Sequence, residues 1–249
     1  MKIANWNLQR INPSENRAQL ICDQMKSINA DIWVLTETHE LVGPGEHFSS
    51  VMSGKHDLES NSGEHWASIW SRYPMKPLPS FVSDESRCTA ALIVHPDFGD
   101  VTVYATVLTW NGSKWRGIES AGGAAFEAAL KAYKSDWQRL RAAFPNALHV
   151  VAGDFNQDLA PYHYYGSKKQ RELLQDALTE THMVAVTANA NDPIETDSAH
   201  RHACIDHICV SDSPLPRVIQ TTRWPESGKP NLQLSDHFGV AVDLTVNFP

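Results

Sequence analysis

Three things are scarce in this sequence: cysteine, long apolar runs and positive charge. The four cysteines are scattered, and the closest pair, Cys204 and Cys209, would point to opposite faces of an expected strand, so we expect no zinc knuckle. No apolar run approaches the roughly 20 residues that cross a membrane. The first residues also lack the apolar core of a signal peptide. We therefore expect a cytoplasmic protein that makes no contact with membranes.

Lysine and arginine number 21 against 29 acidic residues, which leaves a net charge of −8. The chain therefore lacks the broad positive field of a dedicated nucleic-acid binder. An enzyme with a local basic rim is still possible, and a divalent cation can reverse the sign of an acidic pocket. The 249 residues are 42% hydrophobic and include eight tryptophans, so we expect one compact domain over residues 1–249.

Apolar and alternating segments predict a strand-rich α/β fold. The spacing of apolar residues predicts helices over 18–28 and 126–140, and a third helix that Ser167 caps. Two loops, 110–123 and 186–200, have lengths typical of functional loops. The expected strands are 2–8, 32–36, 66–71, 88–95, 101–109, 147–152, 203–210, 216–222 and 238–246.

Polar residues recur at one kind of position, the end of an apolar strand. Strand ends that cluster form a rim on a rigid scaffold, where side chains can converge on a ligand without disturbing the core. The residues are Asn7, Glu37, Asp154 with Asn156, Asp206, and Asp236 with His237.

These residue types suit hydrolysis of a phosphate ester. Asp154 can orient or deprotonate a water molecule, and the Asn156 amide can donate to a phosphate oxygen. Glu37 and Asp236 offer carboxylates and Asn7 a carbonyl, which are ligands that magnesium prefers.

Asp206 and His237 can form a carboxylate–imidazole pair, which would favour a charged ring facing a phosphate. Each feature alone also has a plainer interpretation. Gly-Asp-Phe-Asn at 153–156 could be a turn, a lone Glu a helix cap, and a lone histidine a structural residue. Their conjunction favours a catalytic site.

Six short motifs span the chain from the first strand to the last: NWNLQ (5–9), DIWVLTE (31–37), SRYP (71–74), GDFN (153–156), IDHI (205–208) and SDHF (235–238). In this order they resemble the endonuclease/exonuclease/phosphatase superfamily, which includes the DNase I-like and exonuclease III-like enzymes. The resemblance implies a four-layered α/β sandwich, with two facing mixed β-sheets flanked by helices. It also implies hydrolysis of phosphodiesters or phosphomonoesters with Mg²⁺ or Mn²⁺.

The resemblance also implies a role for each residue. Asn7, Glu37 and Asp236 are similar to metal-site residues, Asp154 to the group that positions the water, Asn156 to a phosphate contact, His237 to the transition-state stabiliser and Asp206 to its orienting partner. The chain departs from the pattern in two places. Gln9 stands where many members have Asp, and no Tyr or His occupies the expected position at Thr106 or Val107.

The loop after residue 109 suggests the substrate. Lys114, Trp115 and Arg116 combine two cations with an aromatic ring, which suits a nucleic-acid backbone and base, although a packed Trp in a solvated loop explains them equally well. Other candidates for substrate contacts are Tyr162 to Tyr165, Lys168, Lys169, Arg171 and 200–202.

We expect a nuclease, with DNA favoured over RNA and no obligate protein partner. A phosphatase or phosphodiesterase acting on a small molecule is the second hypothesis, and a binding module that has lost catalysis is the third. Endonucleolytic and exonucleolytic cleavage, and one metal ion or two, are equally compatible with the motifs.

Overall fold

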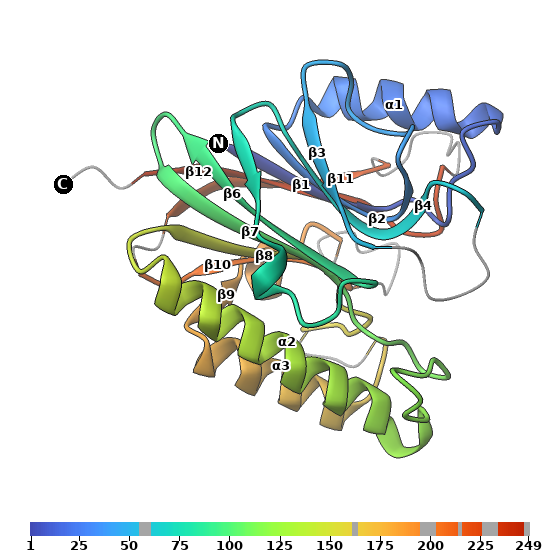
Figure 1. Cartoon of the computed structure of the whole chain (residues 1–249), viewed down its shortest axis with the longest axis vertical. Coiled ribbons are helices and arrows are strands. Elements are labelled where there is room, and N and C mark those ends of the chain that lie inside the picture. Colours follow the sequence, from blue (N-terminus) through green and yellow to red (C-terminus); the bar gives the residue numbers. More distant parts are fainter. Residues whose placement is uncertain (55–60, 161–163, 195–202, 214–215, 226–233, 247–249) are drawn as a thin grey trace.

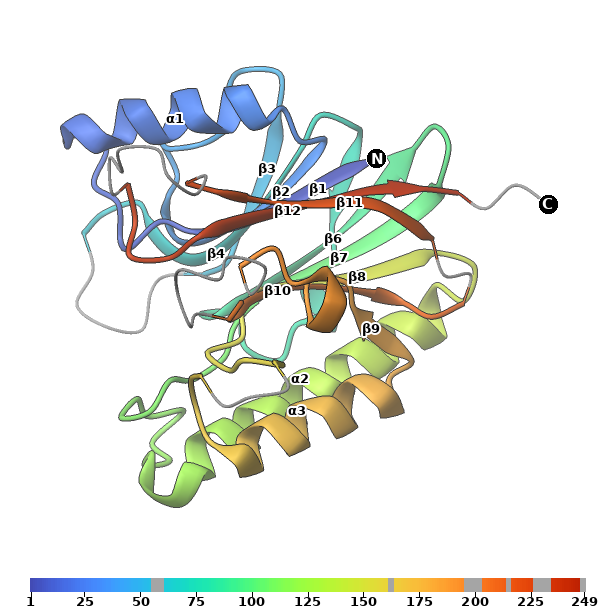
Figure 2. The ribbon, with the colours of Figure 1, turned by 180° about the vertical axis from the view of Figure 1, so that it is seen from behind.

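Two six-stranded β-sheets pack face to face, and helices cover both outer faces (Figures 1 and 2). The computed structural model describes residues 1–54, 61–160, 164–194, 203–213, 216–225 and 234–246. Helix α1 lies on one sheet and helices α2 and α3 lie on the other, which gives four layers. This confirms the predicted α/β sandwich. Among the described residues, no helix has the length and apolar character needed to span a membrane.

The first sheet is built around a parallel pair of strands, with antiparallel neighbours on both sides. Helix α1 (Asn16–Ile28) covers its outer face. The strand order is β11 (Arg217–Trp224), β12 (Gly239–Thr245), β1 (Lys2–Asn7), β2 (Ile32–His39), β4 (Glu64–Ser71) and β3 (Ser49–Met52).

The second sheet repeats this arrangement around the parallel pair β7 and β8. Helices α2 (Ala124–Ala143) and α3 (Lys168–Glu180) cover it, and Ser167 caps α3 as predicted by accepting a bond from the Gln170 N–H at 3.2 Å. The strand order is β5 (Met75–Pro77), β6 (Cys88–His95), β7 (Gly99–Val107), β8 (Leu148–Asp154), β10 (Asp206–Ser211) and β9 (Met183–Ala185). Three short 3₁₀ turns lie at Pro79–Phe81, Ala121–Gly123 and Asn189–Asn191.

Strand β1 shows how alternation directs polar side chains to the space between the sheets. Trp6 and Leu8 pack in the cluster beneath α1, whereas Ile3 lies in the core between the sheets. Asn5 shares the face of Ile3, and its amide nitrogen donates to the Gly153 carbonyl of the opposite sheet at 2.8 Å. Asn7, one step further along, therefore also faces the opposite sheet.

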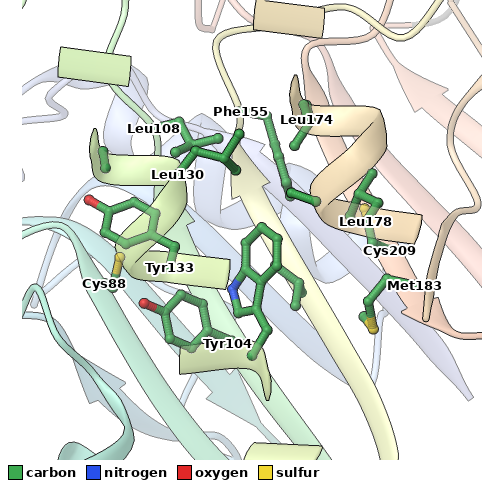
Figure 3. Close-up of a cluster of buried hydrophobic side chains, with 14 of the residues drawn as sticks. Cys88, Tyr104, Leu108, Leu130, Tyr133, Phe155, Leu174, Leu178, Met183 and Cys209 are labelled. Carbon is green, nitrogen blue, oxygen red and sulfur yellow. The ribbon is translucent and has the colours of Figure 1, made fainter. Parts of the chain in front are cut away.

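The outer core of the second sheet contains buried polar groups (Figure 3). Tyr104 projects from β7 and Tyr133 from α2 into this cluster. The Tyr133 hydroxyl donates to Asp84 at 2.8 Å, and the Tyr104 hydroxyl donates to Asp136 at 2.8 Å. Since a buried carboxylate needs such donors, these bonds fix the segment around Asp84 against α2.

Candidate active site

The predicted polar strand ends meet at one edge of the two sheets. Asn7 ends β1 and Asp154 ends β8. Strand β10 runs antiparallel to β8 and pairs Asp206 directly with Asp154. Asp236 and His237 lie just before β12, separated from it by Phe238, and β12 runs antiparallel to β1. The starts of β10 and β12 therefore lie at the same edge as the ends of β1 and β8.

Asn7 bridges two carboxylates from different sheets. Its amide nitrogen lies 3.1 Å from Glu37 Oε1 and 3.2 Å from Asp154 Oδ2. Its amide oxygen accepts a bond from the Gln9 N–H at 2.8 Å. The sequence suggested that Asn7 would offer its carbonyl to a metal. In this structure its amide nitrogen donates to Glu37 and Asp154 and holds them together, and the metal contact of its carbonyl stays a prediction.

Glu37 owes its orientation to an unusual backbone. The sequence predicted that Glu37 ends its strand, but β2 continues to His39. Regular alternation would place Glu37 with Trp33 and Leu35 under α1. Its φ of 47° lies in the left-handed region, and the side chain reaches Asn7 on the inner face. Such a conformation costs about 1 to 3 kcal/mol and is typical of functional sites.

Asp206 and His237 form the predicted pair, with Asp206 Oδ2 2.7 Å from His237 Nδ1. The two side chains are 4% and 17% exposed. Burial acts to lower the pKa of His237, but the charge of Asp206 and its hydrogen bond outweigh this and raise the pKa to about 10. The ring therefore carries a positive charge at neutral pH.

His207 faces away, as alternation predicts, and its Nε2 lies 3.1 Å from the Gln157 carbonyl oxygen.

Asp154 lies beside this pair and is 2% exposed. Burial, and then the charge of Asp206, raise its pKa to about 7, while the charge on His237 opposes the shift. The preceding Gly153 is required by close packing, because a Cβ there would lie 1.9 Å from the Thr106 carbonyl oxygen. Phe155 points the other way, into the cluster between α2 and α3 (Figure 3).

Asn156 lies next to Asp154 but does not continue the strand, because β8 ends at Asp154. Its φ is 49°, its backbone N–H donates to Asp154 Oδ1 at 2.8 Å, and its side-chain nitrogen donates to the Leu108 carbonyl at 2.9 Å. Since a primary amide has a second N–H, this contact leaves one for a ligand. The predicted phosphate contact stays a prediction.

Comparison with known proteins identifies the family of this chain. The family model described as Endonuclease/Exonuclease/phosphatase family matches residues 4–237. The chain belongs to this family. No curated protein matches the chain in sequence.

Solved structures share the endonuclease/exonuclease/phosphatase fold at low identity. An AP endonuclease from Leishmania major has a TM-score of 0.69 at 15% identity, over 97% of this chain and 86% of that one. An AP endonuclease from Archaeoglobus fulgidus has a TM-score of 0.68 at 16% identity, over 99% and 100%. A 3'-5' exonuclease from Neisseria meningitidis has a TM-score of 0.63 at 20% identity, over 98% and 99%.

The position at which the resemblance led us to look for a Tyr or His holds Thr106 and Val107. The Thr106 hydroxyl lies 3.3 Å from Cys88 Sγ, in the outer core, and Val107 is fully buried. Thr106 therefore directs its hydroxyl away from the site.

The basic-aromatic loop departs from the expectation. Trp115 is only 7% exposed, and its indole N–H donates to Asp84 at 2.7 Å. Its ring is part of the core, which is the plainer of the two interpretations and argues against stacking on a base. Arg116 lies over that ring and bonds to the Ser83 carbonyl, and Lys114 pairs with Glu119 at 2.7 Å. These cations are already bound to groups of the protein.

The other candidate cations are also paired. Lys168 and Lys169 form ion pairs with Glu172 and Glu127, and Arg171 pairs with the buried Asp158 at 3.0 Å. The candidates Tyr162, His163 and 200–202 lie outside the described residues.

A cavity of about 370 Å³ opens beside His237, a feature that the sequence did not reveal. Tyr164, Ile205 and Phe238 line it, together with Asp206. Ile205, Asp206 and Phe238 lie at the starts of two expected strands and Tyr164 lies before α3, so only their closeness to the IDHI and SDHF motifs could have indicated the cavity.

The donor set fits a hard divalent cation. Single ligand atoms of Asp154, Asp206 and His237 lie within 4.8 Å of one another, but the charged His237 ring has no lone pair for a metal, so only the carboxylates of the site could be ligands. Asp206 Oδ1 is buried and has no hydrogen-bond partner among the described residues. Burial raises the pKa of Glu37, as do the charges of Asp236 and Asp206. A cation would relieve this crowding of carboxylates, and oxygen donors are those that Mg²⁺ and Mn²⁺ prefer.

Proposed function

We propose that this chain hydrolyses phosphate esters with Mg²⁺ or Mn²⁺, and that its substrates are phosphodiester bonds of nucleic acid, DNA before RNA. The observation that carries the proposal is the charged Asp206–His237 pair beside the buried Asp154 carboxylate. One cationic donor and one base, held together by two sheets, are the groups that attack of water on a phosphate requires.

Asp154 acts as the base in this proposal. A pKa of about 7 is well matched to accepting a proton from water near neutral pH. The water oxygen forms a bond to phosphorus while the bond from phosphorus to the leaving oxygen breaks. His237, charged and held by Asp206, donates a hydrogen bond to a phosphate oxygen as negative charge develops there.

Glu37 and Asp236 would hold the metal, and Asn7 would orient the Glu37 carboxylate. When bound, a divalent cation supplies positive charge to the phosphate and to the leaving oxygen.

A nucleic-acid substrate is supported by the cavity beside His237. Its Tyr164 and Phe238 rings suit a sugar or a base next to the scissile phosphate. Among proteins of the same fold, one structure is a 3' phosphatase from Neisseria bound to a product DNA hairpin. The basic-aromatic loop no longer supports this choice, since Trp115 is buried.

A small phosphate ester is the second candidate, and the net charge of −8 favours it. A long polyanion is repelled by an acidic surface, whereas a small ester meets only the site. The two candidates differ in their response to salt, because each phosphate contact of a nucleic acid releases counterions.

The test is a substrate panel with purified protein and Mg²⁺ or Mn²⁺. The panel contains single-stranded, duplex and abasic DNA, RNA and phosphomonoesters, each measured at 50 and at 200 mM salt. A nuclease should lose activity steeply over that range, and a small-ester hydrolase should lose little. If none of these substrates is hydrolysed, the proposal is refuted.

A further inference from the structure

Two loops carry or flank the groups proposed to hold the metal. The β1 loop, residues 8–11, follows Asn7, and the β12 loop, residues 234–237, contains Asp236 and His237. The backbone of the β1 loop is unusual, because Gln9 and Arg10 have φ values of 53° and 49°. Consecutive left-handed residues without glycine persist only where the surroundings hold them.

Arg17, in the first turn of α1, bonds to both loops. Its Nη1 donates to the Leu8 carbonyl at 3.2 Å and to the Leu234 carbonyl at 2.9 Å. Its Nη2 donates to the Gln9 carbonyl at 2.8 Å. The side chain is 23% exposed, and its Nε lies 2.6 Å from a carboxylate oxygen of Glu15. One guanidinium thus joins two neighbouring carbonyls of the β1 loop to one carbonyl of the β12 loop, more than 200 residues away in the sequence.

Further bonds connect the same loops beneath Arg17. The Gln9 side-chain oxygen accepts a bond from the Asp236 N–H at 3.2 Å. The Ser235 hydroxyl donates to the Asn7 carbonyl at 2.7 Å, and the Trp6 indole N–H donates to the His237 carbonyl at 3.3 Å. Gln9 therefore has a use at the position where relatives carry Asp: its neutral amide docks on the backbone of Asp236.

The β1 loop is also tied to Glu37. The Ile11 N–H donates to the Glu37 carbonyl at 3.4 Å, and the Leu8 N–H donates to the Thr36 carbonyl at 2.8 Å. A displacement of this loop would move Glu37 and Asp236 relative to one another.

We propose that Arg17 is a positioning residue that clasps the β1 and β12 loops and so sets the affinity of the site for its divalent cation. The inference rests on the proposed function. Arginine is required because its rigid planar fork presents five N–H donors, and a lysine ammonium cannot reach three separated carbonyls in one plane. Mutation of residues that orient metal ligands typically lowers metal affinity roughly ten- to a hundredfold.

The test compares Arg17→Lys with a matched control, Arg72→Lys. Arg72 is similarly exposed and donates to the Ala30 carbonyl at 2.9 Å, but it pairs with Asp31, which precedes β2 at the opposite end from Glu37. Both variants keep the positive charge and lose the planar guanidinium. Hydrogen exchange of the metal-free proteins reports loop order, and titration with Mn²⁺ reports the dissociation constant.

In Arg17→Lys, the amides of Gln9 and Asp236 should exchange about tenfold faster, and Mn²⁺ should bind at least tenfold more weakly. Arg72→Lys should leave both values unchanged. Gln9→Asn keeps a residue type that tolerates the left-handed backbone, but its shorter side chain cannot reach Asp236. It should speed exchange at Asp236 even if Arg17→Lys does not fold.

If the amides of Arg17→Lys exchange as slowly as those of the wild type, the clasp is refuted, whatever the Mn²⁺ affinity of the variant. Faster exchange with unchanged Mn²⁺ affinity would overturn its link to the metal. If the wild-type protein binds no Mn²⁺ while Arg17→Lys still speeds exchange, the proposed function fails and the clasp is only structural.

Discussion

Replacing Asp206 with asparagine should remove the positive charge of His237 at neutral pH. Burial alone lowers the pKa of this ring, and the charge and hydrogen bond of Asp206, with smaller contributions from the charges of Asp154 and Asp236, raise it to about 10. Asparagine keeps the shape and can still accept a bond from Nδ1, but it has no charge. The pKa of His237 should therefore return to its ordinary value of 6.5 or fall below it.

The same shift has a consequence for stability. Because the pKa of His237 is raised on folding, its contribution to the free energy of unfolding is fully present below pH 6.5 and is lost as pH rises through about 10. One pKa unit corresponds to about 1.4 kcal/mol, so this contribution is on the order of a few kcal/mol. The Asp206→Asn variant should be less stable than wild type at pH 6.5, and the difference should shrink towards pH 10.

Two measurements check this prediction. A pH titration of the histidine Cε1–H signals by NMR, in metal-free protein, gives the pKa of His237 directly. Urea unfolding at several pH values gives the difference in free energy. A wild-type His237 that titrates near 6.5, or an Asp206→Asn variant with an unchanged His237 pKa, would refute the reasoning.

Three further outcomes follow from the structure. Gly153→Ala should destabilise the protein by several kcal/mol in thermal unfolding, because its Cβ would collide with the Thr106 carbonyl. The control Gly99→Ala, which has open space around its Cβ, should cost about 1 kcal/mol. Trp115→Phe should lose about 1 to 3 kcal/mol of stability in urea unfolding, because the buried Asp84 carboxylate loses one of its donors and keeps Tyr133, but its hydrolytic rate should not change. A large loss of rate would support a substrate role for the ring. Chelation should abolish hydrolysis, and added Mg²⁺ should restore it; activity in excess chelator would contradict the metal requirement.

The sequence was sufficient to predict much of the fold and the site. The polar residues at strand ends were expected to converge, and Asn7, Asp154 and Asp206 do lie at one edge of the sheets. The contact between Asp206 and His237 was also predicted, because both follow from motif and strand position. These features depend on local patterns.

The features that were not predicted depend on long-range contacts. The short edge strands β3, β5 and β9 lack a clear periodicity, because partner strands define them. Glu37 reaches the site through a left-handed backbone conformation that the sequence pattern does not predict. Trp115 could equally have been a surface residue, because its burial depends on Asp84, which lies 31 positions away.

The central claim is that Asp154 is the base of a hydrolytic site. Its most direct test is the rate of Mg²⁺-dependent hydrolysis of single-stranded DNA and of a simple phosphodiester by Asp154→Asn. Asp136→Asn is the matched control, because Asp136 is also buried but lies in the outer core. We predict that Asp154→Asn lowers the rate by about 10² to 10⁴, while Asp136→Asn loses stability and keeps its rate per folded molecule. Equal rates for Asp154→Asn and wild type would contradict the account.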